Sequence, residues 1–295
     1  MLLHPRSFFK SIKTAMKKLM LLTFYAGLSL SCSKSDKAVS SEYEPPVADT
    51  STQKVITVMS YNVRSCIPYV PAGNTTPDVS ATADVIRSIS PDVVLIQELD
   101  IKTTRSYNTD QLAALAGYTG MQYTYFSKAS TYQGGDFGIA ILSKHKIEFS
   151  KTHLLPKLEV PGRYVEQRAL CETRITFPGG HTYTVATTHL DLTVENRLAQ
   201  VPVIDSILSR SSYPVIFGGD LNAVPGSETI DLLDAAAFEN TCKTNCFTIP
   251  STGPDRQLDY ITIRPAGKFK VVSHQVIGGV TASDHLPVVT VLEMK

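Results

Sequence analysis

The stretch DVVLIQE, residues 92–98, decides the fold of this chain. Its centre is an unbroken run of Val, Leu and Ile, a pattern typical of a β-strand that is covered on both faces. Such a strand needs one apolar layer above it and another below it. The stretch ends in Gln97 and Glu98. Because the end of a strand reaches the rim of a sheet, these two side chains are candidates for a functional site.

Five further segments also place polar groups at the boundary of an apolar run. They are SYN (60–62), THLD (188–191), GGDLN (218–222), LDY (258–260) and SDH (283–285). We expect the strand ends to carry these carboxylates, amides and imidazoles to one rim. The set predicts a site for a divalent metal and a phosphoester, assembled from residues that lie far apart in the chain.

The remaining patterns indicate more strands than helices. Strands are predicted at 54–61, 92–96, 121–126, 137–142, 146–154, 169–177, 182–188, 214–217, 258–263, 269–276 and 287–292. Helices are predicted near 79–89, 110–116, 195–208 and 227–235, and Pro202 should make the third helix begin late or bend. Hairpin-linked strands with doubly buried runs predict an α/β four-layer sandwich of two packed mixed β-sheets flanked by helices.

The first 54 residues differ from the rest of the chain. Four lysines between residues 10 and 18 precede an apolar run at 19–30, which resembles a secretion signal and is short for a membrane span. Ser31 and Cys32 resemble the end of a bacterial lipoprotein signal, which predicts a signal peptide at 1–32 and a lipid anchor at Cys32. An ordinary signal peptide and an uncleaved anchor are the alternatives. Each of them takes the protein out of the cytoplasm.

The rest of the chain divides into a linker and one domain. Residues 33–53 have almost no large apolar groups, so we expect a flexible linker there. Residues 54–295 suffice for a single catalytic domain, which we expect to be a monomer. The net charge of +1 and the lack of dense Lys/Arg clusters weaken the case for a tight binder of duplex DNA.

Four cysteines remain if Cys32 carries a lipid. Cys242 and Cys246 form a close pair in a polar loop, and we expect a disulfide between them. A zinc site built on the same CxxxC pair is the alternative, but the sequence places no second Cys/His pair nearby.

Two pairs of residues are candidates for the metal and the attacking water. Glu98 and Asn62 suit a hard cation such as Mg²⁺, with Mn²⁺ or Ca²⁺ as alternatives. Asp220 and Asn222 lie two residues apart on the same side of the chain and can hold and deprotonate a water. A surface position for Glu98 and an Asx turn at Asp220 are the simpler interpretations.

Imidazole and guanidinium groups complete the predicted site. His189 and His285 each have a carboxylate close by in the sequence, Asp191 and Asp284, that can orient the ring or keep it protonated. Asp259 would orient a catalytic histidine. Arg168 can hold a phosphate oxygen, or it can form a salt bridge with Glu166 or another acid.

In their order and spacing, these segments resemble the endonuclease/exonuclease/phosphatase superfamily, over about residues 54–293. The resemblance implies a deoxyribonuclease I-like fold and hydrolysis of a phosphoester. It also implies Mg²⁺ on Asn62 and Glu98, an attacking water on Asp220 and Asn222, and catalytic roles for Asp284 and His285. His189 resembles the histidine of the deoxyribonuclease and sphingomyelinase branches, and Asp259 the aspartate that pairs with a histidine there.

For the substrate, the sequence favours a phosphodiester, either a lipid headgroup or a small organic diester. A nuclease acting outside the cytoplasm is the second choice and a phosphomonoesterase the third. A binding module that has lost turnover is a hypothesis from another class, and the complete set of acids, amides and imidazoles argues against it.

Overall fold

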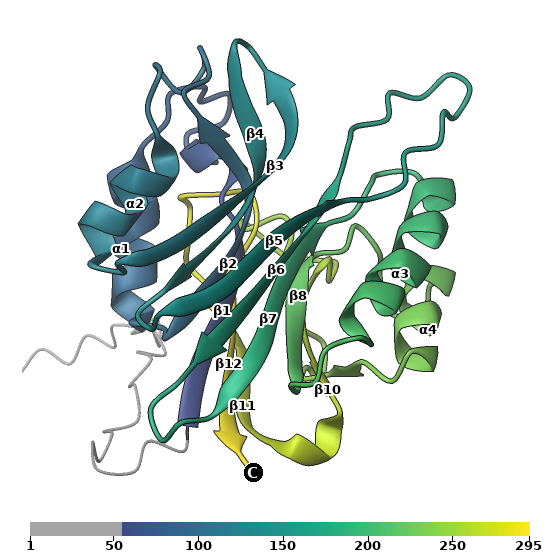
Figure 1. The fold of residues 1–295 in the computed structure, drawn as a ribbon. Helices are drawn as coiled ribbons and strands as arrows, with labels where there is room; N and C mark the ends of the chain where they lie inside the picture. Colours follow the sequence, from purple (N-terminus) through teal and green to yellow (C-terminus); the bar gives the residue numbers. More distant parts are fainter. Residues whose placement is uncertain (1–54) are drawn as a thin grey trace, which may run out of the picture. The chain divides into compact units, whose positions relative to one another are not determined.

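The computed structural model describes residues 55–295, which form the predicted four-layer sandwich (Figure 1). One sheet has the strand order β11-β12-β1-β2-β4-β3 and the other the order β5-β6-β7-β8-β10-β9. The first sheet contains β1 (Val55–Asn62), β2 (Val93–Ile101), β3 (Tyr123–Tyr132), β4 (Gly135–Ser143), β11 (Phe269–Val276) and β12 (Val288–Met294). The second contains β5 (Ile147–Leu154), β6 (Ala169–Thr176), β7 (Thr182–His189), β8 (Val215–Asp220), β9 (Glu239–Asn240) and β10 (Asp259–Arg264).

Helices cover the outer face of each sheet. The helices α1 (Val79–Ile89) and α2 (Gln111–Thr119) lie against the first sheet, and α3 (Val194–Leu208) and α4 (Glu228–Ala235) lie against the second (Figure 1). Buried side chains of α1 and α2 pack with those of β1, β2 and β4. Those of α3 and α4 pack with β7 and β8. A third apolar cluster fills the space between the sheets, so a strand such as β2 is buried on both faces.

Each sheet contains one parallel strand pair near its centre. β1 runs parallel to β2, and β7 runs parallel to β8, while the other pairs are antiparallel. A helix connects each parallel pair, α1 in the first sheet and α3 in the second. Parallel strands end at the same rim, and these four end at or near Asn62, Glu98, His189 and Asp220. The topology therefore explains why the predicted site residues collect there.

Local predictions agree with the structure except at a few places. β2 continues to Ile101 through an irregularity between Ile96 and Leu99, instead of ending at Glu98. The two-residue strand β9 was not predicted. Helix α3 begins at Val194 and contains Pro202, so the expected late start is wrong. The proline removes one hydrogen-bond donor, but the apolar face of α3 is packed on its sheet and the helix continues.

The cysteine prediction is confirmed, because Cys242 and Cys246 form a disulfide. Among residues 55–295 the other two cysteines, Cys66 and Cys171, are buried and free. The predicted signal peptide at 1–32, the lipid at Cys32 and the linker at 33–53 lie outside the described residues and stay predictions. None of the described helices is long and apolar enough to cross a membrane.

Candidate active site

A cavity of about 370 Å³ opens at the rim where the two sheets present these strand ends. It receives side chains from both sheets and from six loops. The residues that line it are Glu98, Arg105, Tyr132, Phe137, Glu166, Arg168, His189, Leu192, Asp220, Asn222, Ile249, Leu258 and His285. Six of the nine predicted site residues are among them: Glu98, Arg168, His189, Asp220, Asn222 and His285.

Asn62 links the two sheets at the base of the site. Its Nδ2 donates hydrogen bonds to Glu98 Oε1 and Asp220 Oδ2, each at 3.0 Å. Its Oδ1 accepts a hydrogen bond from the backbone N–H of Arg64 at 3.1 Å. The amide nitrogen bridges two carboxylates, and the amide oxygen, which a hard cation would take, keeps one lone pair beyond its bond with Arg64. The role of Asn62 as a metal ligand stays a prediction.

Glu98 reaches the cavity because β2 is irregular there. The pairing of β2 with β4 shifts register between Ile96 and Leu99, and Glu98 has a φ of 55°. Irregularities of this kind turn a side chain away from the direction that a regular strand would give it. A left-handed backbone at a residue other than glycine is costly, and functional sites are among the places where such strain is retained. Glu98 remains partly exposed, as a ligand for a cation would need to be.

Asp220 is the central carboxylate. Its Oδ1 accepts the backbone N–H of Asn222 at 2.9 Å, and its Oδ2 lies 3.4 Å from His189 Nε2 and 3.7 Å from His285 Nε2. Burial raises the pKa of Asp220 to about 6, although the positive charge of His285 and two hydrogen bonds lower it. A carboxylate with this pKa is ionised at neutral pH and still accepts a proton readily.

Gly218 and Gly219 are required by the neighbouring strands, not by a ligand. A Cβ on Gly219 would overlap the Thr188 carbonyl of β7, and one on Gly218 would overlap the Tyr260 carbonyl of β10. Gly219 also has a φ of 142°, which side chains disfavour. The glycines thus let β8 approach both partners closely, which brings Asp220 to its place.

Asn222 follows Asp220 in a left-handed conformation, with a φ of 47°. Its Nδ2 donates a hydrogen bond to the Leu190 carbonyl at 2.9 Å. This bond fixes the amide, while the side chain lines the cavity beside Asp220. Asp220 and Asn222 thus line the same cavity, and their role in holding a water stays a prediction.

His285 is held by Asp259 and not by its sequence neighbour Asp284. Its Nδ1 donates to Asp259 Oδ2 at 2.8 Å, and its Nε2 faces Asp220. Burial lowers the pKa of His285, but the negative charges of Asp259 and Asp220 outweigh this effect and raise it to about 10. The imidazolium form therefore dominates at neutral pH. Asp259 does not line the cavity, and acts on His285 from behind.

Asp284 lies outside the cavity wall. Its Oδ2 is 3.6 Å from Arg64 Nε, and its Oδ1 accepts a hydrogen bond from Ser283 at 3.4 Å. The structure therefore does not bring Asp284 together with the other predicted catalytic groups. Its backbone carbonyl accepts a hydrogen bond from Ser251, which ties the SDH segment to the loop after the disulfide.

His189 differs from His285 in its charge. Burial and the positive charges of Arg168 and His285 hold its pKa well below the ordinary value, so the ring is neutral. Its Nδ1 is buried and has no hydrogen-bond partner within the described part of the chain. Asp191, its neighbour in the sequence, instead accepts hydrogen bonds from Thr193 at the start of α3. The carboxylate beside His189 is Asp220.

Arg168 forms the salt bridge that was one of its two predicted interactions, and its contact with a phosphate oxygen stays a prediction. It lines the cavity, and its guanidinium group lies 3.1 Å from Glu166 Oε2 and 3.8 Å from Asp191 Oδ2. Burial raises the pKa of Glu166, although the positive charge of Arg168 lowers it. The Arg168 cation is thus fixed in place with part of its charge still directed at the cavity.

Arg105 is the main site residue that sequence reasoning missed. Its Nε and one terminal nitrogen donate to both oxygens of the buried Asp100, at 2.7 and 2.9 Å. The guanidinium carbon lies 4.3 Å from the ring centre of Tyr132 and 5.3 Å from that of Phe137. The TTR segment at 103–105 follows β2 closely. However, Arg105 has no acid nearer in the sequence than Asp100, so its bidentate pair with Asp100 could not be predicted from the sequence.

The residues present fit a divalent cation. Asp220, Asp259 and His285 bring possible ligand atoms within 4.8 Å of one another. Asp259 and His285 already bond to each other, so the carboxylates free to face a cation in the cavity are Glu98 and Asp220. Asn62 holds these two close together, which concentrates negative charge. Oxygen donors of this kind suit a hard cation such as Mg²⁺.

Comparisons with known proteins agree with this geometry. The sequence profile described as "Endonuclease/Exonuclease/phosphatase family" matches residues 59–285. The chain belongs to the endonuclease/exonuclease/phosphatase family. Members of this family are hydrolases that act on phosphoester bonds, and the chain is an enzyme of this class. A search of curated protein sequences found no match.

Several solved structures of endonuclease/exonuclease/phosphatase proteins share the fold. One from Beutenbergia cavernae is 24% identical over 81% of this chain and 72% of its own, with a TM-score of 0.66. A mannosyl-6-phosphatase from Bacteroides thetaiotaomicron is 15% identical over 80% and 99%, with a TM-score of 0.63. The human nocturnin catalytic domain, solved with a bound sulfate anion, is 19% identical over 82% and 94%, with a TM-score of 0.61.

Proposed function

We propose that this protein hydrolyses a small phosphodiester in a reaction that depends on a divalent metal, with Asp220 as the base that activates water. The observation that carries the proposal is the position of Asp220. It is buried at the centre of the cavity wall, and it is contacted by Asn62, His189 and His285 from three different strand ends or loops.

The attacking water would lie between Asp220 and Asn222. The Asp220 pKa of about 6 leaves a carboxylate at neutral pH that accepts the water's proton as the oxygen attacks phosphorus. Asn222 is fixed by its bond to Leu190, so it can orient the same water. Asn62 keeps Asp220 beside Glu98 throughout.

Cationic donors would bind the phosphoryl oxygens. His285 is held as an imidazolium by Asp259, and its Nε2 side faces the cavity. Arg168 and Arg105 supply fixed guanidinium groups. Donors that are already in place when charge develops on the phosphoryl group give the largest catalytic effect. Glu98 and Asp220 would hold the divalent cation, which would act as a Lewis acid and neutralise part of this charge.

The dimensions of the cavity favour a small organic group next to the phosphate. Its volume of about 370 Å³ is within the range of sites for small molecules. Tyr132, Phe137 and Leu192 give it an apolar side, which suits a lipid headgroup or a small ester better than a duplex. The net charge of +1 for the whole chain also favours a small substrate over duplex DNA.

Hydrolysis of bis-p-nitrophenyl phosphate tests the proposal directly. We expect turnover with added Mg²⁺ or Mn²⁺, loss of turnover with EDTA, and recovery when excess metal is restored. Asp220→Asn should reduce kcat on the order of 10²-fold or more, while Asp231→Asn on the exposed face of α4 should leave it unchanged. Undiminished turnover in EDTA, or in Asp220→Asn, would refute the mechanism.

A panel of substrates separates the diester from the alternatives. Hydrolysis of p-nitrophenyl phosphate at a higher kcat/KM than the diester would indicate a phosphomonoesterase. Nicking of supercoiled plasmid would indicate a nuclease. Absence of turnover on all three, with binding of phosphate esters retained, would indicate the inactive binding module.

A further inference from the structure

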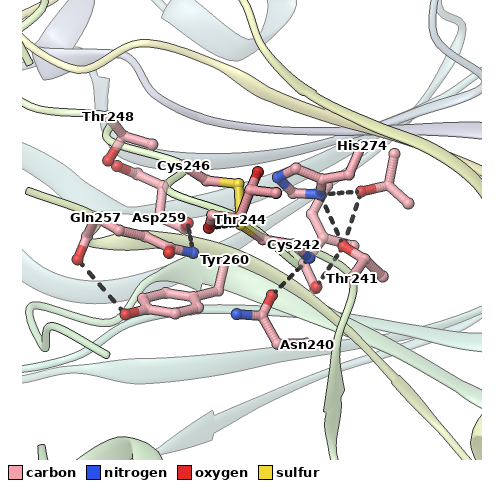
Figure 2. The surroundings of a disulfide bond; sticks show 12 residues. Asn240, Thr241, Cys242, Thr244, Cys246, Thr248, Gln257, Asp259, Tyr260 and His274 are labelled. Carbon is pink, nitrogen blue, oxygen red and sulfur yellow. Dashed lines mark hydrogen bonds between the residues drawn. A yellow bond between two sulfur atoms is a disulfide. The ribbon is translucent and has the colours of Figure 1, made fainter. Parts of the chain in front are cut away.

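A disulfide and a histidine meet where the loop that follows β9 contacts β11, and Figure 2 shows the two cysteines beside His274. Cys242 and Cys246 lie in the loop that follows β9 of the second sheet, and His274 lies in β11 of the first. The two sulfurs and a ring nitrogen of His274 lie within 4.8 Å of one another. The function proposed above uses none of these residues.

His274 is held with one nitrogen free. Its Nδ1 is 2.9 Å from Thr241 Oγ1 and 2.9 Å from Thr290 Oγ1. The Thr241 hydroxyl donates its hydrogen to the Ile261 carbonyl at 2.8 Å. The oxygen of this hydroxyl therefore accepts the hydrogen bond from Nδ1–H of His274. This places the proton on Nδ1 and leaves a lone pair on Nε2. Within residues 55–295 Nε2 is buried and has no hydrogen-bond partner.

The same arrangement is typical of histidines that bind metals. Such a ring donates its second N–H to a fixed acceptor, which sets the tautomer and the orientation of the other nitrogen. A neutral imidazole next to two cysteine sulfurs is a donor set for a borderline or soft metal.

We propose that, once the Cys242–Cys246 disulfide is reduced, the two sulfurs and Nε2 of His274 bind one Zn²⁺ ion. A water would complete the tetrahedral coordination that zinc prefers. In the sequence, a zinc site was the less favoured interpretation, because no second Cys/His pair is near in the chain. The fold supplies the third ligand from the other sheet.

The chemistry balances with a dithiol reductant. The S–S bond takes up two electrons and two protons and becomes two thiols, while the reductant becomes a disulfide. Both thiols then lose their protons to solvent as their sulfurs bind Zn²⁺. The disulfide joins residues only four apart, so it constrains little of the unfolded chain, and its reduction should leave the domain folded.

Cobalt substitution tests the site, because thiolate ligands give Co²⁺ charge-transfer absorption that oxygen ligands do not. The full-length protein is compared before and after reduction with a dithiol, which is removed before metal is added. We expect thiolate-to-cobalt bands after reduction, absent from the oxidised protein, and displacement of the Co²⁺ by one equivalent of Zn²⁺ per chain. The oxidised protein contains the same catalytic cavity, so metal bound there cancels in the difference.

Variants assign the ligands. Cys242→Ser with Cys246→Ser should remove the bands while Cys66 and Cys171 are still present. His274→Gln should weaken Zn²⁺ binding by at least tenfold, and His153→Gln, on β5, should not. The proposal is overturned if the reduced protein binds no more Zn²⁺ than the oxidised protein. It is also overturned if His274→Gln, shown to be folded by circular dichroism, binds Zn²⁺ as tightly as the natural chain. Activity on the phosphodiester is measured separately, so failure of one proposal does not affect the other.

Discussion

Asp259 Oδ2 accepts a hydrogen bond from His285 Nδ1 at 2.8 Å, across a separation of 26 residues and between a strand and a loop. Burial lowers the pKa of His285, but the negative charges of Asp259 and Asp220 outweigh it and raise the pKa to about 10. His285 is therefore a cation at neutral pH. Asp259 is wholly buried and does not line the cavity. It is a positioning residue whose effect reaches the substrate through His285.

Asp259→Asn should change the pH profile of the reaction as well as its rate. Below the His285 pKa of about 10 the ring is protonated, and activity should fall as pH rises through this value. Loss of the Asp259 charge lowers that pKa, so the alkaline limb should move to lower pH. We expect kcat at neutral pH to fall on the order of 10²-fold. A rate loss with an unmoved alkaline limb would mean that Asp259 has only a structural role.

Arg105→Lys should weaken substrate binding more than it slows turnover. Lysine keeps the charge but loses the planar fork that bonds both oxygens of Asp100, so the cation would leave its fixed place at the cavity. We expect KM to rise roughly tenfold with a smaller change in kcat. Lys128→Arg, at an exposed ion pair with Asp136 on β3 and β4, is the control and should change neither constant. Equal losses in kcat and kcat/KM would contradict this assignment.

Gly219→Ala should destabilise the domain by about 2–4 kcal/mol, because the new Cβ overlaps the Thr188 carbonyl and the φ of 142° disfavours a side chain. Gly117→Ala is the matched change. Gly117 lies inside α2, with no described atom within 4 Å of its added Cβ, and should gain about 0.5–1 kcal/mol. Urea unfolding followed by circular dichroism measures both. Similar midpoints for the two variants would show that β8 can move away from β7.

Cys66 and Cys171 should resist alkylation in the native protein. Burial raises the pKa of each thiol to about 12, so very little thiolate forms at pH 8. We expect iodoacetamide to label neither residue until the protein unfolds, and to label two further cysteines per chain after mild reduction. Peptide mass mapping identifies the positions. Rapid labelling of Cys66 or Cys171 at pH 8 in folded protein would contradict the burial.

The sequence supports prediction of the strands and of the rim, because both follow from local pattern. The apolar run of β2 indicates a strand covered on two faces, and polar residues at strand ends identify Glu98 and Asp220 before any contact is known. Family resemblance adds the pairing of Asp259 with a histidine. The order of strands in each sheet depends on contacts between distant residues, and local pattern does not contain it.

The side-chain partners could not be predicted in the same way. Asp191 is close to His189 in the sequence, but it accepts a hydrogen bond from Thr193 instead. Asp284 is next to His285, but it pairs with Arg64. Asp284 is adjacent to His285, and the side chains of adjacent residues tend to point in different directions. Asp191 lies beyond the end of β7 at His189, so strand alternation does not set its direction. The ring of His285 is oriented by β10 and that of His189 lies against the end of β8.

Asn62 gives the site a mechanical property. It belongs to one sheet, and its single amide nitrogen spans the gap to a carboxylate of each, Glu98 in its own sheet and Asp220 in the opposite one. A slippage of one β-layer past the other by even an ångström would break this bridge and separate the acids. The turnover rate should therefore depend strongly on how the two sheets are aligned. Low concentrations of a denaturant that loosen the packing between the sheets should abolish activity before the protein unfolds.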